Sequence, residues 1–289
     1  MTAWRLLVTE PRDGARNMAV DEALLLSRLT GEGPPTVRLF AWDPPTISLG
    51  YGQPLDERVN VALAQTLGVG LVRRPTGGSA VYHDTREREV TYSVAASSGD
   101  HPGFEDLLET YRIIGAALVS GLRRLGVSAE LIPVGRNRAD SQPTFCFART
   151  GSYEVEVAGK KIVGSAQRRR TERGQGRGFL QHGSILLGAD AERLRALFPR
   201  QADPLAGMTT VESVLGQRPS FRRTVEAMVS GFEEALGTVL VSGEVTLDET
   251  ALAERLVSAK YGQPAWTERG QAPRGFDGVT RQGVPVPHC

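Results

Sequence analysis

The segment from Leu71 to Asp84 constrains this chain more than any other, because a strand-like run leads directly into a glycine pair and out again into polar residues. Gly77 and Gly78 have no Cβ, so they tolerate positive φ angles and let another molecule lie against exposed backbone N–H groups. Arg73 precedes the pair and His83 follows it. These residue types predict a pocket for an oxyanion, a carbonyl or an acyl chain. The same segment also fits an ordinary glycine hairpin turn between two strands.

Length and charge limit the classes of protein that this chain can represent. With 289 residues, it is long enough for one large or two small globular domains. Lys and Arg (34) nearly balance Asp and Glu (33), so no global field would recruit nucleic acid or an anionic membrane. The N-terminal apolar run is too short for a signal peptide, and no stretch approaches the roughly 20 apolar residues of a membrane span. We therefore expect a cytoplasmic protein without nucleic-acid or membrane partners.

Cysteine usage points to a single reactive thiol. The chain has two cysteines, Cys146 and Cys289, and neither belongs to a CxxC or Cys/His spacing that would hold zinc. We therefore expect neither a disulfide framework nor a metal site. Cys289 is the last residue, where chains are usually frayed, so we treat it as incidental. Cys146 is the thiol placed for chemistry.

Hydrophobic periodicity predicts both helices and strands in the first half of the chain. Residues 17–29 are typical of a helix with Asn17 as its N-cap. Apolar residues at spacings of three and four predict a second helix from Phe104 to Leu125, which Gly126 would end. Short apolar or alternating runs bounded by Gly and Pro predict strands over residues 36–40, 46–49, 70–73, 79–82 and 90–95.

The second half of the chain predicts more strands and then helices. A strand-rich block extends from Glu130 to Leu187, interrupted by the basic segment Arg168–Arg177, which lacks periodicity and predicts a mobile loop. That loop would be either simply solvated or a docking surface for an acidic partner protein. The remainder predicts a helix over 221–236, a strand over 238–247, a helix over 249–261 and then Pro/Gly-rich coil. This order indicates an α+β sheet domain with helices packed against it.

Three further motifs connect the glycine segment to a known family. They are Phe145–Phe147, Gly159–Gln167 and Leu180–Leu187. Together and in this order, the four motifs resemble the lipoate/octanoate protein ligase and transferase family, over roughly residues 1 to 265. Within the family they look closest to the cysteine-dependent octanoyltransferases. The resemblance implies the mixed sheet with packed helices of biotin and lipoate protein ligases, a catalytic domain over 1–265 and a C-terminal coil tail over 266–289.

The resemblance also implies an activity. Family members of this kind move an octanoyl group from acyl carrier protein to a lysine of a lipoyl domain, such as the glycine-cleavage H protein or a dehydrogenase E2 domain. A thioester donor suits a cysteine nucleophile, because exchange between thiols is nearly neutral and transfer to an amine is downhill. We therefore expect no cofactor. Free cysteine titrates at about 8.5, so Cys146 needs a nearby cation, and Lys161 occupies the family position of the lysine that meets the acyl carbonyl.

Each implied site residue has a structural alternative. Cys146 could be a small buried hydrophobe between two phenylalanines, and Lys161 could be a surface lysine beside Lys160. By the resemblance, Gly77, Gly78 and Gly164 line the acyl tunnel, with nearby N–H groups holding the carbonyl oxygen, whereas the alternative is ordinary turn glycines. Arg73 is assigned with them to substrate binding.

The two histidines near these motifs are harder to assign. His83 could form a dyad with the cysteine, whereas the resemblance places it beside the glycine turn, where we expect it to support the pocket. His182 carries the same ambiguity.

Two other functions compete with octanoyl transfer. An ATP-dependent lipoate ligase would share the glycine motif and the lysine, but the ligases of the family have a Gly-Asn pair shortly after the His-Asp. Here Thr85–Ser93 takes that place and carries Glu89. The third possibility is a protein that only binds acylated partners, which would need neither Cys146 nor Lys161.

Overall fold

A mixed eight-stranded sheet forms the centre of the molecule. The computed structural model describes residues 3–133, 153–172, 176–201 and 203–270. Strands follow the order β11-β1-β2-β6-β10-β9-β8-β7, and a second sheet of order β4-β3-β5 lies beside them. The strands are β1 (Trp4–Val8), β2 (Thr36–Phe40), β3 (Thr46–Leu49), β4 (Gly70–Arg73), β5 (Val81–His83), β6 (Glu89–Ser97), β7 (Glu130–Pro133), β8 (Tyr153–Val157), β9 (Lys160–Glu172), β10 (Gly176–Leu186) and β11 (Leu240–Ser242).

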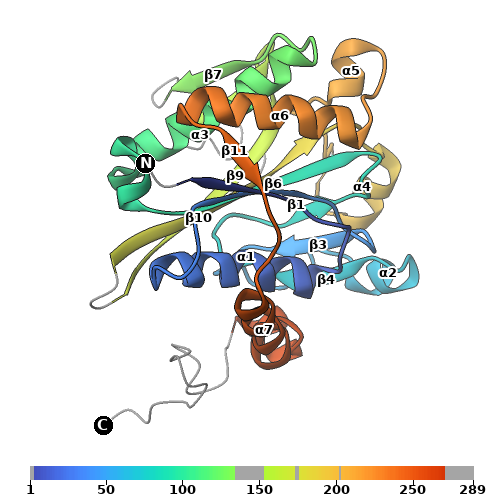
Figure 1. The fold of residues 1–289 in the computed structure, drawn as a ribbon. Helices are drawn as coiled ribbons and strands as arrows, with labels where there is room; N and C mark the ends of the chain where they lie inside the picture. The colour runs from blue at the N-terminus through green and yellow to red at the C-terminus, as the bar shows by residue number, and fades with distance from the viewer. Residues whose placement is uncertain (1–2, 134–152, 173–175, 202, 271–289) are drawn as a thin grey trace.

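Helices cover both faces of the large sheet, so the predicted α+β class is confirmed. The α-helices are α1 (Gly14–Leu29), α2 (Val61–Thr66), α3 (Leu107–Arg124), α4 (Ala191–Leu197), α5 (Val211–Leu215), α6 (Phe221–Leu236), α7 (Leu247–Leu256) and α8 (Pro264–Arg269). In Figure 1, α3 and α6 lie above the sheet, whereas α1 lies below it with α7 beneath. No helix in the described ranges is long and apolar enough to span a membrane.

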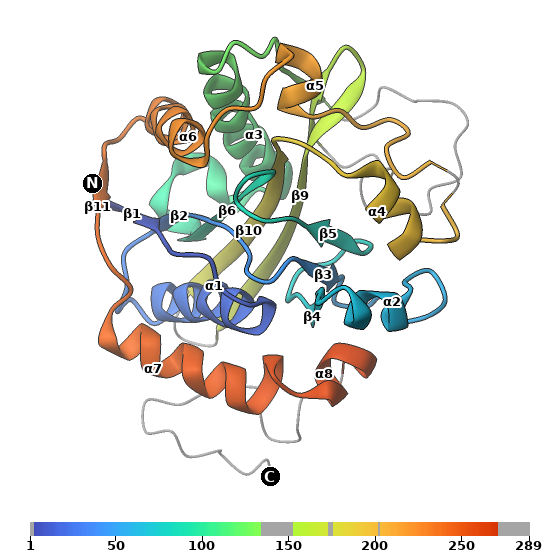
Figure 2. The same cartoon turned by 90° about the vertical axis from the view of Figure 1, so that its right-hand side faces the viewer.

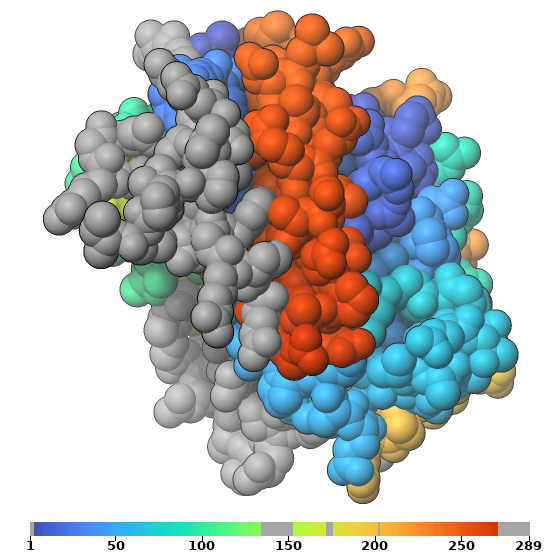
Figure 3. All heavy atoms as spheres, turned by 90° about the horizontal axis from the view of Figure 1, so that it is seen from below, coloured from blue at the N-terminus to red at the C-terminus, as the bar shows by residue number. Residues whose placement is uncertain are grey.

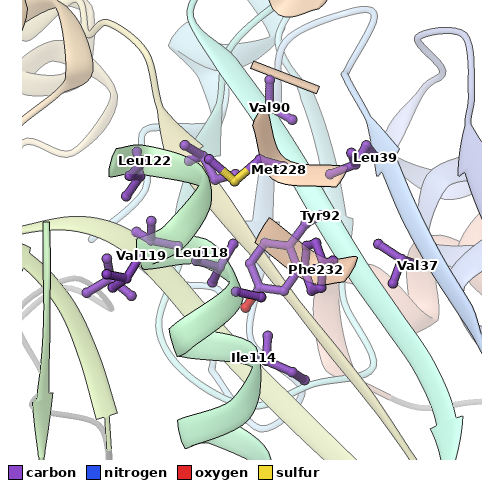
Figure 4. Packing of buried hydrophobic residues seen from close by; sticks show 14 of the residues in the cluster. Val37, Leu39, Val90, Tyr92, Ile114, Leu118, Val119, Leu122, Met228 and Phe232 are labelled. Atoms are coloured by element: carbon purple, nitrogen blue, oxygen red, sulfur yellow. The ribbon is translucent and has the colours of Figure 1, made fainter. Parts of the chain in front are cut away.

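The upper face of the sheet is an apolar core. Tyr92 of β6 and Phe232 of α6 lie close together in it, with ring centroids 6.0 Å apart (Figure 4). The two covering helices approach closely at Gly231, where a Cβ atom would lie 2.3 Å from the carbonyl oxygen of Ala117. The absence of a side chain at this position therefore lets α6 pack directly against α3.

The lower face of the sheet is polar where α1 crosses it. Arg38 of β2 and Asp21 of α1 form an ion pair of 2.8 Å, and both side chains are 0% exposed. The helix begins earlier than predicted, because Asp13 caps it by accepting a hydrogen bond from the N–H of Arg16. Asn17 is therefore not the cap. It is buried, and its amide donates to two loop carbonyls.

Several predicted elements have the expected bounds. Strands 36–40, 46–49 and 70–73 and the helix over 221–236 are confirmed without a shift. The predicted strands 79–82 and 90–95 move by one or two residues, to 81–83 and 89–97. The helix predicted from Phe104 starts at Leu107, because Asp106 caps it, and Phe104 lies in a short 3₁₀ turn before it.

The prediction of a mobile loop over Arg168–Arg177 is wrong at both ends of that segment. β9 continues to Glu172 and β10 starts at Gly176, as two arms of one antiparallel hairpin. Arg169 of this segment is held by the rest of the molecule: its guanidinium donates to the carbonyl oxygens of Phe104, Glu105 and Asp106. Hydrogen bonds across the hairpin and to these carbonyls outweigh the low strand propensity of the segment.

The C-terminal part also departs from prediction. The strand expected over 238–247 is short, because Thr246 and Glu249 form a capping box that starts α7 at Leu247. α7 ends in a π-helical turn over Val257–Tyr261. The coil predicted beyond residue 261 contains α8, which Arg73 and Trp266 attach to the rest of the domain. In Figure 3, the orange to red spheres of this C-terminal part form one ridge on the surface seen from below.

Candidate active site

A narrow cavity lies between the lower face of the large sheet and the small sheet, at the end of α1 that Figure 2 shows beside β3 and β4. The space between its lining atoms is about 440 Å³, and part of this space is open solvent. Its walls are Met18, Trp42, Ser48, Arg74, Val81, His83, Thr91, Gly164–Ala166 and His182–Ser184.

Strand register explains why polar side chains collect on one side of this cavity. His182 of β10 pairs with Ser93 of β6 and with Ala166 of β9. Two positions away, Ser184 pairs with Gly164 in the same way. Because directly opposite residues of antiparallel strands share a face, these positions form one stripe on the α1 side of the sheet.

His83 lies in the cavity wall, as the resemblance implied, with both ring nitrogens engaged. Nδ1 lies 2.8 Å from a carboxylate oxygen of Glu89, to which Nδ1–H donates, and Nε2 lies 2.8 Å from Ser48 Oγ. The ring stacks on Trp42, with centroids 4.0 Å apart. His83 thus connects Ser48 of β3, Glu89 of β6 and the Trp42 ring within the cavity wall, and its supporting role stays a prediction.

His182, like His83, is buried and bonded through both ring nitrogens, and we call such a chain of hydrogen bonds through a histidine a relay. Its Nδ1 lies 3.0 Å from Asp21 and its Nε2 lies 2.6 Å from Thr76 Oγ1. Burial lowers the pKa of His182, although the hydrogen bond to Asp21 acts in the opposite direction. Burial would raise the pKa of Asp21, but the hydrogen bond from His182 and the charge of Arg38 outweigh it and lower that pKa. Together, these shifts favour a neutral imidazole beside a carboxylate.

The predicted glycines have different positions. Gly164 lines the cavity, whereas Gly77 and Gly78 do not and lie in the exposed turn beside it. Gly78 has a φ of +96°, as predicted for a residue that needs glycine. A Cβ on Gly50 would lie 1.8 Å from the Gly78 carbonyl oxygen, so the loop that begins at Gly50 packs directly on the turn.

Arg73 and Arg74 are neighbours with different surroundings. Arg73 is 1% exposed and lies outside the cavity. Its guanidinium donates to the carbonyl oxygens of Gly50, Tyr51, Gln53, Trp266, Thr267 and Glu268. Burial lowers the pKa of Arg73. The structure therefore does not bring Arg73 to the cavity; Arg74 lines it instead and donates to Ser48 Oγ at 3.2 Å.

Lys161 is buried rather than on the surface. Its Nζ lies 2.6 Å from a carboxylate oxygen of Glu154, with 7% and 11% of the two side chains exposed. The Lys161 backbone is fixed on its other side by hydrogen bonds to Gly207 and Thr209. Along β9, Lys161 is three residues from the cavity-lining Gly164, about 10 Å at roughly 3.3 Å per residue. Cys146 lies outside the described residues, so its prediction stays a prediction.

Several functional candidates were not predicted from the sequence. Trp42 closes part of the cavity wall, and Asp21 and Ser48 orient the two histidines. Each is far in sequence from the histidine that it contacts, and no local pattern marks it. Within the described ranges, no group of three or more His, Cys, Asp or Glu side chains is placed to hold a metal ion.

Comparison with known proteins assigns the chain to a family. Residues 13–233 match the model of the lipoyl protein ligase A/B catalytic domain. The chain belongs to this family. Relatives of this lipoyl protein ligase A/B member include octanoyltransferase LipM of Kyrpidia tusciae, 45% identical over 93% of the chain and 100% of the relative. Octanoyltransferase LipM of Symbiobacterium thermophilum is 39% identical over 93% of the chain and 99% of the relative.

Solved structures agree with this lipoyl protein ligase A/B assignment and confirm the predicted lipoate-ligase fold. A lipoate-protein ligase A bound with ATP superposes with a TM-score of 0.76 at 27% identity, over 93% of this chain and 99% of that one. A bipartite lipoate protein ligase of Thermoplasma acidophilum, studied with its E2 lipoyl domain, gives a TM-score of 0.72 at 26% identity, over 93% and 97% of the two chains.

Proposed function

We propose that this protein is an octanoyltransferase of lipoate biosynthesis, which attaches an octanoyl group to a lysine of a lipoyl domain. The observation that carries the proposal is the 45% identity to octanoyltransferase LipM of Kyrpidia tusciae over the whole of that relative. The Thermoplasma acidophilum ligase, described together with its E2 lipoyl domain, supports a lipoyl domain as the acceptor. Acceptors of this kind include the glycine-cleavage H protein and dehydrogenase E2 domains.

Octanoyl-acyl carrier protein is the donor in this proposal, and Cys146 is the nucleophile. The Cys146 thiolate attacks the thioester carbonyl, a new thioester forms on the enzyme, and the carrier thiol leaves with a proton. The acceptor lysine, as a free amine, then attacks this thioester. An amide forms, the cysteine thiolate is released, and the amine loses its proton to solvent. Both steps exchange an activated acyl group, so ATP is not consumed.

The cavity supports an acyl substrate. Its β9 wall at Gly164 and the Trp42 ring suit a thin apolar chain better than a bulky polar ligand. Burying the chain contributes about 0.8 kcal/mol per methylene, several kcal/mol for an octanoyl group. Gly77, Gly78 and Gly164 would provide backbone next to the acyl carbonyl, and His83 would support the wall.

Lys161 supplies the positive charge in this mechanism. In this proposal the Lys161 side chain, buried beside Glu154, stabilises either a thiolate or the oxyanion that forms on the acyl carbonyl. Glu154 fixes the ammonium group in place. We infer that Lys161 acts with Cys146 in catalysis.

Intact mass spectrometry tests this function. The protein is mixed with octanoyl-acyl carrier protein, without ATP or acceptor, beside a Cys146→Ala variant. The proposal predicts a gain of one octanoyl group that hydroxylamine removes and that the variant lacks. Addition of a lipoyl domain should then move the group to the acceptor lysine.

An ATP-dependent lipoate ligase is the second candidate, because a solved relative binds ATP. The segment after Asp84 argues against it: Thr85–Ser93 takes the place where ligases carry a Gly-Asn pair, and the carboxylate of Glu89 within it is engaged by His83 and by the Asp84 N–H. Modification of the lipoyl domain only with free octanoate or lipoate and ATP would establish the ligase and exclude the transferase.

A further inference from the structure

The glycine turn beside the cavity is fixed from several directions through its carbonyl groups. The contacts are Arg168 to Pro75 O (3.1 Å), the Tyr51 N–H to Thr76 O (2.8 Å), and Arg74 to both Gly77 O (2.6 Å) and Ser79 O (2.8 Å). The donors come from three separate parts of the fold. A turn held in this way has little freedom to adjust its backbone.

The N–H side of the same turn has no backbone acceptor within the part of the chain that the structure describes. Gly77 and Gly78 are exposed, and no backbone acceptor in the described ranges pairs with the N–H groups of Gly77, Gly78 or Ser79. Successive unpaired N–H groups in a turn form a concave site that favours negative charge. Their usefulness for an oxyanion depends on where the turn holds them, because such donors must lie within a few tenths of an ångström of their working position.

One side chain of the turn points inward and anchors it. Thr76 is 0% exposed, does not line the cavity, and lies next to Gly77 in the chain. Asp21 can only accept, so His182 donates to it from Nδ1, which leaves Nε2 to accept from the Thr76 hydroxyl at 2.6 Å. The buried relay therefore has one consistent set of donors and acceptors, from α1 through β10 to the turn.

The start of this relay is itself rigid. Asp21 Oδ1 accepts from Arg38 and from Ser93 Oγ, both at 2.8 Å, while Oδ2 accepts from His182. The relay through His83 ends differently, on Ser48 of β3. The two histidines thus hold different elements, and His182 is the one bonded to the glycine turn.

We propose that Asp21, His182 and Thr76 form a positioning relay that sets the N–H groups of the glycine turn against the acyl carbonyl. This inference rests on the proposed function, because it takes the turn as the carbonyl-binding element. Thr76 and Asp21 act through other groups and are positioning residues. Loss of the Thr76 hydroxyl does not change the cavity that holds the acyl chain, but it lets the glycine turn move. The loss should therefore slow acyl transfer without weakening binding of the acyl chain.

The test measures single-turnover octanoyl transfer by Thr76→Val, which keeps the shape of the side chain and removes the hydroxyl. Thr76→Ser, which restores the hydroxyl, is the rescue variant. Thr224→Val is the matched control, because Thr224 is also 0% exposed and bonds a carbonyl, in α6 away from the cavity. Rates are normalised to the fraction of molecules that can be acylated, which removes any effect of partial unfolding.

We expect Thr76→Val to lower the single-turnover rate constant about tenfold or more, with the donor concentration for half-maximal rate nearly unchanged and the preference for octanoyl over shorter and longer chains retained. Thr76→Ser should recover most of the rate, and Thr224→Val should match the unaltered protein. A His182→Ala, Thr76→Val double variant should be no slower than His182→Ala alone, since both changes break one relay.

Two results would overturn the relay. One is a Thr76→Val variant as fast as Thr224→Val; the other is a double variant whose loss equals the product of the two single losses. If the unaltered protein itself transfers no octanoyl group, the proposed function fails and the relay fails with it, which is a different result from an active protein that tolerates Thr76→Val.

Discussion

Replacing Arg73 with Met decides whether this arginine binds substrate, as its place in the glycine motif predicts, or holds the fold together, as its contacts indicate. Methionine keeps the apolar stem and removes the guanidinium. The six carbonyl acceptors of Arg73 come from the loop Gly50–Gln53 and from α8, which are about 200 residues apart in the chain. The substitution would leave both segments without their common donor.

The expected magnitude follows from these contacts. A hydrogen bond with a charged partner contributes about 1.5–3 kcal/mol, and removing one member of a buried charged network costs about 3–5 kcal/mol, because the contributions are not additive. We expect Arg73→Met to lower the free energy of unfolding by about 3–5 kcal/mol. A loss of this size is a large fraction of the roughly 5–15 kcal/mol by which globular proteins are stable.

Urea unfolding followed by tryptophan fluorescence provides the assay, since Trp266 donates to the Arg73 carbonyl and packs against this cluster. Arg16→Met is the control: the Arg16 side chain is 63% exposed and pairs with Asp13 at the surface, so a change within about 0.5 kcal/mol is expected. KM for the octanoyl donor is measured on the folded fraction. A stability loss below about 1 kcal/mol together with a raised KM would refute the structural role and restore the substrate-binding role.

Three further predictions concern the site and the fold. Lys161→Ala should abolish octanoyl transfer while Lys160→Ala, which removes an exposed lysine, leaves it nearly unchanged; the reverse result in the mass assay would contradict the assignment. Trp42→Ala should let longer acyl chains compete with octanoyl, by up to about fourfold per added methylene in relative kcat/KM, and unchanged chain-length preference would show that the chain does not reach this ring. Burial would raise the pKa of Glu249, but the hydrogen bond and charge of Arg5 outweigh it and lower the pKa. Because the pKa of Glu249 is lower in the folded state, its pair with Arg5 stabilises the fold above the unfolded pKa, near 4.5, and this contribution is lost as the pH falls. Glu249→Gln should therefore weaken the dependence of the free energy of unfolding on acid pH. An identical pH profile for the variant and the unaltered protein would contradict this.

The sequence determined those elements that local patterns specify. The strands 36–40, 46–49 and 70–73 have alternating or apolar runs bounded by Gly and Pro, and the helix over 221–236 has a Ser cap and a Gly stop. The glycine motif predicted a turn that needs positive φ, which Gly78 has. Family resemblance, rather than composition, supplied the fold and the expected chemistry.

Long-range contacts decided the rest. Arg73 and Arg74 are adjacent and chemically identical, yet they point to different sides of the chain as it leaves β4, so one holds α8 and the other lines the cavity.

The His182 relay joins α1 to β10 across 161 positions, and the two ends of the segment Arg168–Arg177 pair as antiparallel strands through contacts that the sequence of the segment does not reveal. Residue type and spacing fix what a side chain can do and which face of its own element it occupies. Only the packing of elements distant in the chain determines which partner it meets, because a buried polar group takes its role from the donors and acceptors that surround it.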